Sequence, residues 1–220
     1  MSVARWQPYY SDREVELDRR IHALGLMLAL IATPLLLCLA AESRRPGLVL
    51  PCAIYALSLL GMLASSSLFR HPPLRWWRYR WFFRRLDHAA IFLFIAGTYT
   101  PFTVAQMRDG WAIGLTVAVW AGALTGAAYK LAIPVALQRP SPVAFAALAS
   151  LVLFGLRPTL MSMAPSAVGL IGAGVAFYIV GAAIHHRAMA FHTPIWHGFV
   201  VAGVACHFAA VLYGVVLAPG

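Results

Sequence analysis

Four residues with chemically useful side chains interrupt a strongly apolar chain, and they lie in three distant parts of the sequence. Ser67 and His71 are four residues apart, so in a helix they share a face. Asp87 follows in the next apolar run, and His197 lies near the end of the chain. Imidazole nitrogens and carboxylate oxygens are zinc ligands, and a catalytic zinc site keeps one position open for water. A fold that gathers these residues could therefore bind a divalent metal ion.

The composition indicates what kind of fold must position them. Of the 220 residues, 61% are apolar and 11% are charged, whereas about a quarter of the residues in a soluble domain are charged. This excludes a free-standing soluble globule, and the high hydrophobicity excludes a disordered tail. The formal charge of +10 comes from cations in short gaps between apolar runs, which is typical of a multi-spanning membrane protein.

Seven apolar runs are candidates for membrane-crossing helices, each of which needs about 20 residues. They are 21–41, 48–69, 86–105, 111–133, 143–156, 166–184 and 194–217, and the fifth is short and flanked by prolines. The first run is too long for the core of a cleavable signal peptide, so we expect none. Short connections make neighbouring helices antiparallel. We therefore predict an all-α protein, a single domain over residues 1–220 that forms a seven-helix membrane bundle.

The distribution of Lys and Arg sets the orientation of this bundle. If the N-terminus is cytoplasmic, the inner segments hold thirteen of these cations and the outer segments hold four. Because cytoplasmic loops carry the excess of Lys and Arg, we predict a multi-pass protein of the cell (inner) membrane. Residues 1–20 are then cytoplasmic and the C-terminus is outside. Ser67, His71, Asp87 and His197 all come to the cytoplasmic edge of the bundle, where ionisable groups are costly unless paired, wetted or metal-bound.

The segment 70–85 combines six arginines with several aromatic residues. Such a mixture can bind nucleic acid, but a loop between two membrane spans has a plainer use for it. Arginines contact anionic headgroups, and aromatic rings lie at the membrane interface. We therefore expect membrane lipids as partners and no nucleic acid.

Four runs of residues carry a family resemblance. They are 65–71 (SSSLFRH), 86–91 (LDHAAI), 95–102 (IAGTYTPF) and 195–200 (IWHGFV). Together they resemble the bacterial hemolysin III group of the progestin and adipoQ receptor superfamily, which consists of seven-span proteins with a buried zinc ion. The last match continues at Gly203, His207 and Phe208. Weaker similarity occurs near the start and in the sixth predicted run, at Glu14, Asp18, His22, Gly25, Gly174, Tyr178 and Gly181. At the position of Asp18 the family more often has Asn.

The resemblance implies a zinc ion held by the His of Ser-x3-His and by a His-x3-His pair that opens the seventh helix. His71 and His197 match, but Thr193 occupies the third position and His192 precedes it. In one continuous helix His192 would point about 140° away from His197. Thr193 followed by Pro194 instead predicts an N-cap and a first helical residue, which would leave His192 free to turn towards the metal. We predict His71, His197 and His192 as zinc ligands. The alternatives are His22 as a substitute ligand, or a degraded site that binds zinc weakly or not at all.

The resemblance extends to lipid-amide hydrolases such as the alkaline ceramidases, which suggests a mechanism. Zinc-bound water ionises near neutral pH and attacks a carbonyl. Asp87 would accept or orient the water's proton, and Ser67 would hydrogen-bond Asp87 or a developing oxyanion. The leading hypothesis is therefore a zinc-dependent hydrolase that acts on a lipid amide or ester.

Two alternatives to this enzyme stay open. One is a non-enzymatic membrane homeostasis or sensor protein in which zinc has a structural role. The other follows the family's name and is a cytolytic pore. The uniformly apolar runs weigh against the pore, because a water-filled channel needs a polar stripe at helical spacing.

Overall fold

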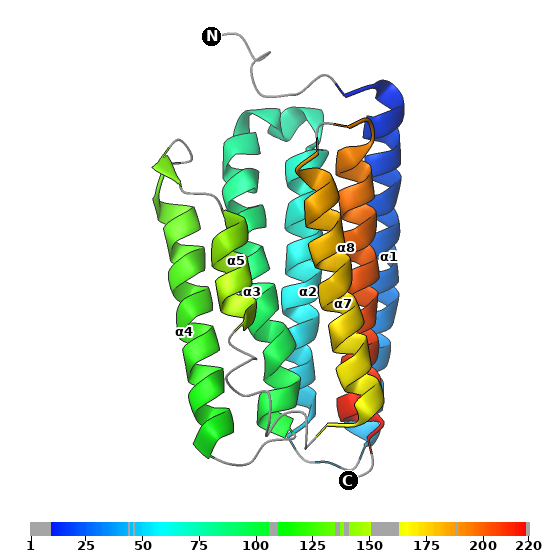
Figure 1. Ribbon diagram of the computed structural model, residues 1–220, viewed down its shortest axis with the longest axis vertical. Coiled ribbons are helices and arrows are strands. Elements are labelled where there is room, and N and C mark those ends of the chain that lie inside the picture. Colours follow the sequence, from blue (N-terminus) through cyan, green and yellow to red (C-terminus); the bar gives the residue numbers. More distant parts are fainter. Residues whose placement is uncertain are drawn as a thin grey trace.

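The computed structural model describes residues 10–43, 45, 47–105, 110–134, 137–138, 141–150, 163–187 and 189–218. Every regular element within these ranges is helical, which confirms the prediction of an all-α protein. The elements are α1 (Asp12–Glu42), α2 (Val49–Arg70), the 3-10 helix η2 (Leu74–Tyr79), α3 (Arg80–Ala105), α4 (Gly110–Ala132), α5 (Ser141–Ala149), α7 (Pro165–His185), α8 (His192–Val211) and the π-helical turn η5 (Leu212–Val216). The long helices lie side by side in one bundle (Figure 1).

Five of the described helices are long and apolar enough to cross a membrane. They are α1, α2, α4, α7 and α8 continued by η5. Helix α3 has 26 residues and packs against α2 and α4. Helix α5 has nine residues and is too short to span alone, and residues 151–162, which include part of the predicted fifth run, lie outside the described ranges. The protein is therefore a multi-pass membrane protein.

Helix α1 begins nine residues before the apolar run that predicts it. A capping box starts the helix: the Glu14 amide donates to the Ser11 hydroxyl (3.3 Å), and the Ser11 amide donates to the Glu14 carboxylate (2.8 Å). The buried residues of α1 then recur every three or four positions, so they form one continuous face: Glu14, Asp18, His22, Gly25, Ala29, Thr33, Leu36 and Ala40. Its first two turns thus carry polar side chains into the bundle.

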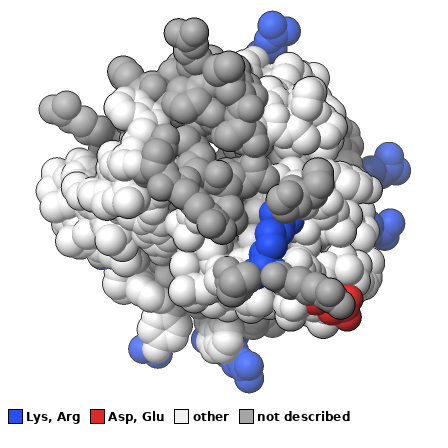
Figure 2. All heavy atoms as spheres, turned by 90° about the horizontal axis from the view of Figure 1, so that it is seen from below, with Lys and Arg blue, Asp and Glu red and all other residues white. Residues whose placement is uncertain are grey.

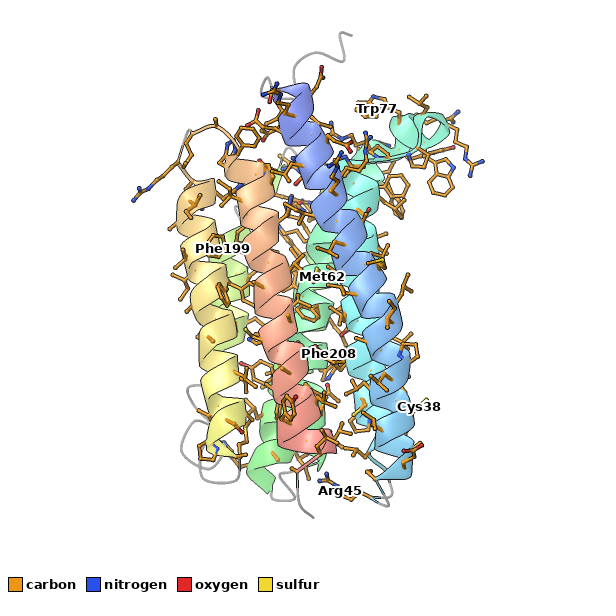
Figure 3. All side chains as sticks on the ribbon, turned by 90° about the vertical axis from the view of Figure 1, so that its right-hand side faces the viewer. Cys38, Arg45, Met62, Trp77, Phe199 and Phe208 are labelled. Carbon is orange, nitrogen blue, oxygen red and sulfur yellow. The ribbon has the colours of Figure 1, made fainter. Side chains whose placement is uncertain are left out.

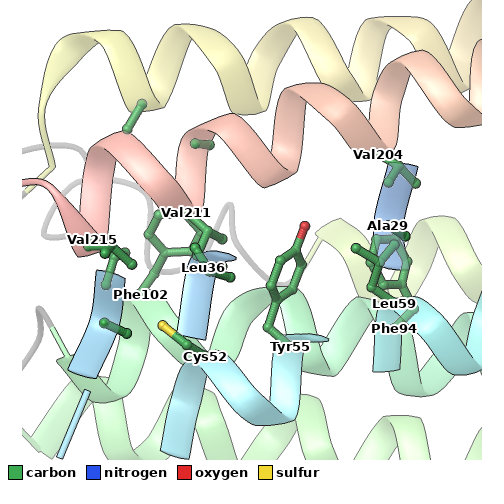
Figure 4. Packing of buried hydrophobic residues seen from close by; sticks show 14 of the residues in the cluster. Ala29, Leu36, Cys52, Tyr55, Leu59, Phe94, Phe102, Val204, Val211 and Val215 are labelled. Atoms are coloured by element: carbon green, nitrogen blue, oxygen red, sulfur yellow. The ribbon is translucent and has the colours of Figure 1, made fainter. Parts of the chain in front are cut away.

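The apolar core lies along the bundle between α1, α2, α3 and α8. Leu36, Tyr55 and Val211 have no exposed surface there, and Figure 4 shows their side chains packed together. On the outside, large apolar side chains such as Ile31 (64% exposed) and Leu57 (71% exposed) face away from the protein. Uncharged residues also make up most of the described surface in the view from below (Figure 2). An apolar exterior of this kind suits lipid as the surrounding solvent.

The two ends of the bundle differ in their arginine contacts. At the end where the chain terminates, Arg45 donates hydrogen bonds of 2.5–3.0 Å to the carbonyls of Val215, Val216 and Ala218. It therefore satisfies carbonyls that the end of a helix leaves without partners. At the other end η2 projects from the bundle and carries Trp77, beside whose ring Arg80 lies (Figure 3).

Candidate metal centre

Asp18 is the centre of a polar cluster at the end of the bundle where α1 and α8 begin and α2 ends. Its side chain is 2% exposed. The His71 Nε2 donates to Asp18 Oδ2 (3.0 Å), and the His197 Nδ1 donates to Asp18 Oδ1 (2.5 Å). Arg70 also donates from Nε to Oδ2 (3.3 Å). One buried carboxylate thus joins residues from α1, α2 and α8.

His22 completes the cluster one helical turn after Asp18. Its Nδ1 lies 2.8 Å from the Asp18 backbone carbonyl. Because a carbonyl oxygen only accepts, this contact places the hydrogen on Nδ1 and leaves the lone pair of a neutral ring on Nε2. The His22 ring centroid is 4.3 Å from that of His197 and 5.4 Å from that of His71. Three imidazoles from three helices therefore surround one carboxylate.

This donor set fits a divalent metal ion. Asp18, His22 and His71 offer ligand atoms that all lie within 4.8 Å of one another, and His197 contacts the same carboxylate. Imidazole nitrogen combined with carboxylate oxygen is a ligand set that zinc accepts. The Asp18 backbone carbonyl holds His22 in one tautomer. Histidines that bind metal ions are commonly oriented by such a hydrogen bond from the ring nitrogen that does not ligate the ion. The residues can therefore hold zinc.

Contacts from the start of α1 to the start of α8 cover this cluster. The Tyr10 hydroxyl hydrogen-bonds the Thr193 hydroxyl (2.9 Å), and the Phe191 amide donates to the Glu14 carboxylate (2.6 Å). Phe191 has a left-handed backbone (φ 61°), which is uncommon outside glycine, and it serves as the N-cap of α8. The Glu14 carboxylate therefore helps to fix the turn into α8.

The start of α8 corrects one expectation from the sequence. Thr193 and Pro194 were expected at the N-cap and the first helical position, but α8 begins at His192 and no side chain caps it. Pro194 is tolerated there because the first helical turn needs no donors within the helix. Thr193 is 1% exposed and directs its hydroxyl to Tyr10 instead. His192 is therefore part of the helix and is not free of helical geometry.

The structure brings together two of the three predicted metal ligands. His71 and His197 both contact Asp18. His192 is directed elsewhere: its Nδ1 donates to the Met189 carbonyl (2.8 Å), and its ring lies 5.4 Å from the ring of His185 and 5.7 Å from that of Tyr10.

The two predicted catalytic residues lie at the same end of the bundle. Asp87 is buried near the start of α3, and its carboxylate is 3.4 Å from His88 Nδ1. Ser67 is half-buried in the last turn of α2, where its carbonyl accepts from the His71 amide (2.8 Å). The neighbouring Ser66 is the serine whose hydroxyl approaches His22 Nε2 (3.4 Å).

Sequence reasoning gave Asp18 too little weight. The first predicted apolar run begins at residue 21, which leaves Asp18 in the segment before the helix. The spacing of Asp18, His22, Gly25 and Ala29 was the available signal, since residues three and four apart share one helical face. Continuing that face backwards past residue 21 identifies Asp18 as inward-facing.

Comparison with known proteins identifies the family to which the chain belongs. The model of the family described as "Haemolysin-III related" matches residues 16–208. The chain is 28% identical over 199 residues to the hemolysin-3 homolog of Bacillus subtilis (strain 168), covering 90% of this chain and 92% of that protein. It is 29% identical over 197 residues to hemolysin-3 of Bacillus cereus, covering 87% of each. Asp18, His22, His71 and His197 all fall within the matched residues.

Proposed function

Because the chain belongs to the haemolysin-III related family, we propose that it is a seven-span protein of the cell (inner) membrane with a zinc site on the cytoplasmic side. The observation that carries the zinc site is the buried Asp18 carboxylate held between His71 and His197. The cation-rich segment 70–85 lies at the same end of the bundle as this site. By the positive-inside rule that end faces the cytoplasm, so the N-terminus is cytoplasmic and the C-terminus is outside.

We assign the ligands from the contacts in the cluster. Asp18, His71 and His197 would hold the ion, with His22 beside them as a fourth donor. Asp18 takes the place that the sequence had given to His192, since His192 contacts the Met189 carbonyl. Arg70 partly balances the Asp18 charge, because its Nε lies 3.3 Å from the same carboxylate oxygen.

The activity that best uses such a site is hydrolysis of a lipid amide or ester. Bound zinc would supply a Lewis acid and an activated water for attack on a carbonyl. Among the residues of the chain, Asp87 would accept the proton and Ser67 would donate a hydrogen bond to the developing oxyanion. The carbonyls of membrane lipids lie at the headgroup level, where this end of the bundle meets the membrane surface. A site at this level supports the proposal of a lipid amide or ester as the substrate.

Metal analysis of the purified protein tests the site directly. We expect close to one zinc per chain, and His197→Ala should lose most of it. His88→Ala is the matched control, because His88 hydrogen-bonds the Arg84 carbonyl (2.9 Å) and is not among the proposed ligands. The zinc site would be refuted if His197→Ala retained as much zinc as His88→Ala.

Activity is tested separately with ceramide or an ester lipid in detergent micelles. Asp87→Asn should keep its zinc and lose turnover, because an amide cannot accept the proton. A fully active Asp87→Asn protein would remove Asp87 from the mechanism.

A structural role for the zinc is the second candidate, and the geometry gives it specific support. Asp18 lies on α1, His71 directly follows α2 and His197 lies on α8, so one ion at this site would tie three helices together. In that case chelation should lower the melting temperature of the wild-type protein but not that of His197→Ala, and no lipid should be hydrolysed. Fatty-acid release that stops on chelation would favour the enzyme instead.

A further inference from the structure

A second polar group lies deeper in the bundle, away from the Asp18 cluster. Five side-chain nitrogen or oxygen atoms among the described residues are buried without a hydrogen-bond partner. Three of them belong to Tyr55 on α2, Tyr178 on α7 and His207 on α8. His207 is ten residues beyond His197, which places it about 15 Å further along α8. The proposed metal centre therefore does not use these groups.

The three groups face the same part of the interior. The ring centroids of Tyr178 and His207 are 5.3 Å apart, with the ring planes at 82°. Tyr55 is fully buried, and its ring centroid lies 6.4 Å from that of Phe208, the residue next to His207 on α8. Figure 4 shows the Tyr55 hydroxyl pointing from α2 towards α8. Hydrogen-bonding atoms from three helices thus converge inside the bundle.

Two glycines make room for the rings at the contact between α7 and α8. A Cβ atom on Gly174 of α7 would lie 2.6 Å from His207 Nε2, and one on Gly203 of α8 would lie 2.5 Å from the Tyr178 ring. Gly174 on α7 thus makes room for the ring of His207 on α8, and Gly203 on α8 makes room for the ring of Tyr178 on α7. Any larger residue at either position would displace a ring, so the backbone is shaped to place these two side chains.

Burial makes unpaired atoms expensive at this depth. Leaving a buried donor or acceptor without a partner costs about 1–3 kcal/mol, and no bulk water reaches the interior of a membrane to reduce that cost. Three such atoms in one place are better explained by a common partner than by three separate penalties. Two phenols and one imidazole offer both donors and acceptors without a formal charge. The partner that matches them is a neutral hydrogen-bonding group.

We propose that Tyr55, Tyr178 and His207 form an interior binding site for one neutral polar group. Its source is either an ordered water molecule or the hydroxyl or carbonyl of a lipid that enters between the helices. Both sources present the same chemistry, in which one oxygen exchanges hydrogen bonds with the two hydroxyls and the imidazole Nε2. The site stands independently of the proposed zinc chemistry, because it shares no residue with the Asp18 cluster.

Removal of single hydroxyl groups distinguishes a partnered site from an unpartnered one. Tyr55→Phe and Tyr178→Phe preserve the rings and delete only the oxygen. If the hydroxyls bind a partner, each variant should lower the melting temperature by about 2–4 °C. If they are unpaired, their deletion removes a penalty, and the melting temperature should stay the same or rise. Tyr213→Phe is the matched control, because Tyr213 is 55% exposed and should show no change.

The same variants in two media identify the source of the partner. One medium is detergent after exhaustive delipidation, and the other is detergent with the co-purified lipid retained. A loss of stability in both media indicates water, and a loss confined to the lipid-containing sample indicates a lipid group. The proposal is overturned if neither variant is less stable than Tyr213→Phe in either medium.

Discussion

A single carboxylate organises the polar end of this bundle. Asp18 accepts hydrogen bonds from His71, His197 and Arg70, which lie on α2 and α8, while it belongs to α1 itself. A buried carboxylate is costly unless it is paired or bound to a metal. Hydrogen bonds from two imidazoles and one guanidinium supply this pairing, and the same donor set supports the proposed metal site.

Replacement of Asp18 tests that interpretation at the scale of one residue. We expect Asp18→Asn to weaken zinc affinity by at least about tenfold, because an amide oxygen is a poorer ligand than a carboxylate. Titration of zinc into the apo protein measures the change. Asp12→Asn is the matched control, since Asp12 is an exposed acid on the same helix. Equal affinities for the two variants would show that Asp18 does not ligate the ion.

Some residues of the site could be predicted from the sequence and others could not. His71 and His197 were predicted because both lie at the cytoplasmic edge of predicted helices, where an ionisable group is costly unless paired or metal-bound, and because both match the histidines that the family resemblance implies. Asp18 lies among other charged residues, so its type carried no signal, and its burial became evident once α1 was seen to begin at Asp12. His192 was assigned from a capping pattern that the backbone does not follow, because the N-cap is the left-handed Phe191, two residues before the expected N-cap Thr193.

At the scale of helices, α2 and α3 pack very closely. A Cβ atom on Gly97 of α3 would lie 2.0 Å from the Ser58 hydroxyl oxygen and 2.8 Å from the Ser58 Cβ on α2. The position therefore accepts no side chain unless the helices move apart. Glycine here permits close packing of membrane helices.

Enlarging this glycine should separate α2 from α3. We expect Gly97→Ala to lower the free energy of unfolding by about 1–3 kcal/mol, as overpacking does in tight cores. Gly61→Ala on α2 provides the comparison, because nothing lies within 4 Å of a Cβ added there, and alanine should leave stability unchanged or raise it by up to about 1 kcal/mol. Denaturation of the two variants in detergent measures the difference. If both variants had the same stability, the close approach of α2 and α3 would not constrain the bundle.

At the scale of the whole molecule, the apolar runs predicted the helices better than they predicted the chemistry. The observed α2, α4 and α7 agree with the predicted runs within one residue at each end. Membrane helices are readily predicted from the sequence, because every backbone N–H and C=O group in lipid must be hydrogen-bonded within the protein. The run at 143–156 was the weakest candidate for a span, because it is short and flanked by prolines. The structure describes a helix over the first part of this run.

The orientation of the bundle is a prediction for the whole molecule, and reporter fusions test it. A phosphatase that is active outside the cytoplasm should be active when fused after Gly220, because the C-terminus is expected outside. The same reporter should be inactive when fused before Met1. The reverse result would put the Asp18 cluster on the outer side and would contradict the positive-inside count.

Membrane leakage separates the proposed function from the pore that the relatives' names suggest. The outer faces of the helices expose large apolar residues, and the interior between α1, α2, α3 and α8 is lined by packed apolar side chains such as Leu36 and Val211. A conducting pore needs a wetted polar path through the bundle. We therefore expect purified protein, reconstituted at low density into dye-loaded vesicles, to release no more dye than protein-free vesicles, and zinc removal should not change this. Dose-dependent release at low protein density would favour the pore, and release that began only after chelation would show that the zinc site holds such a path closed.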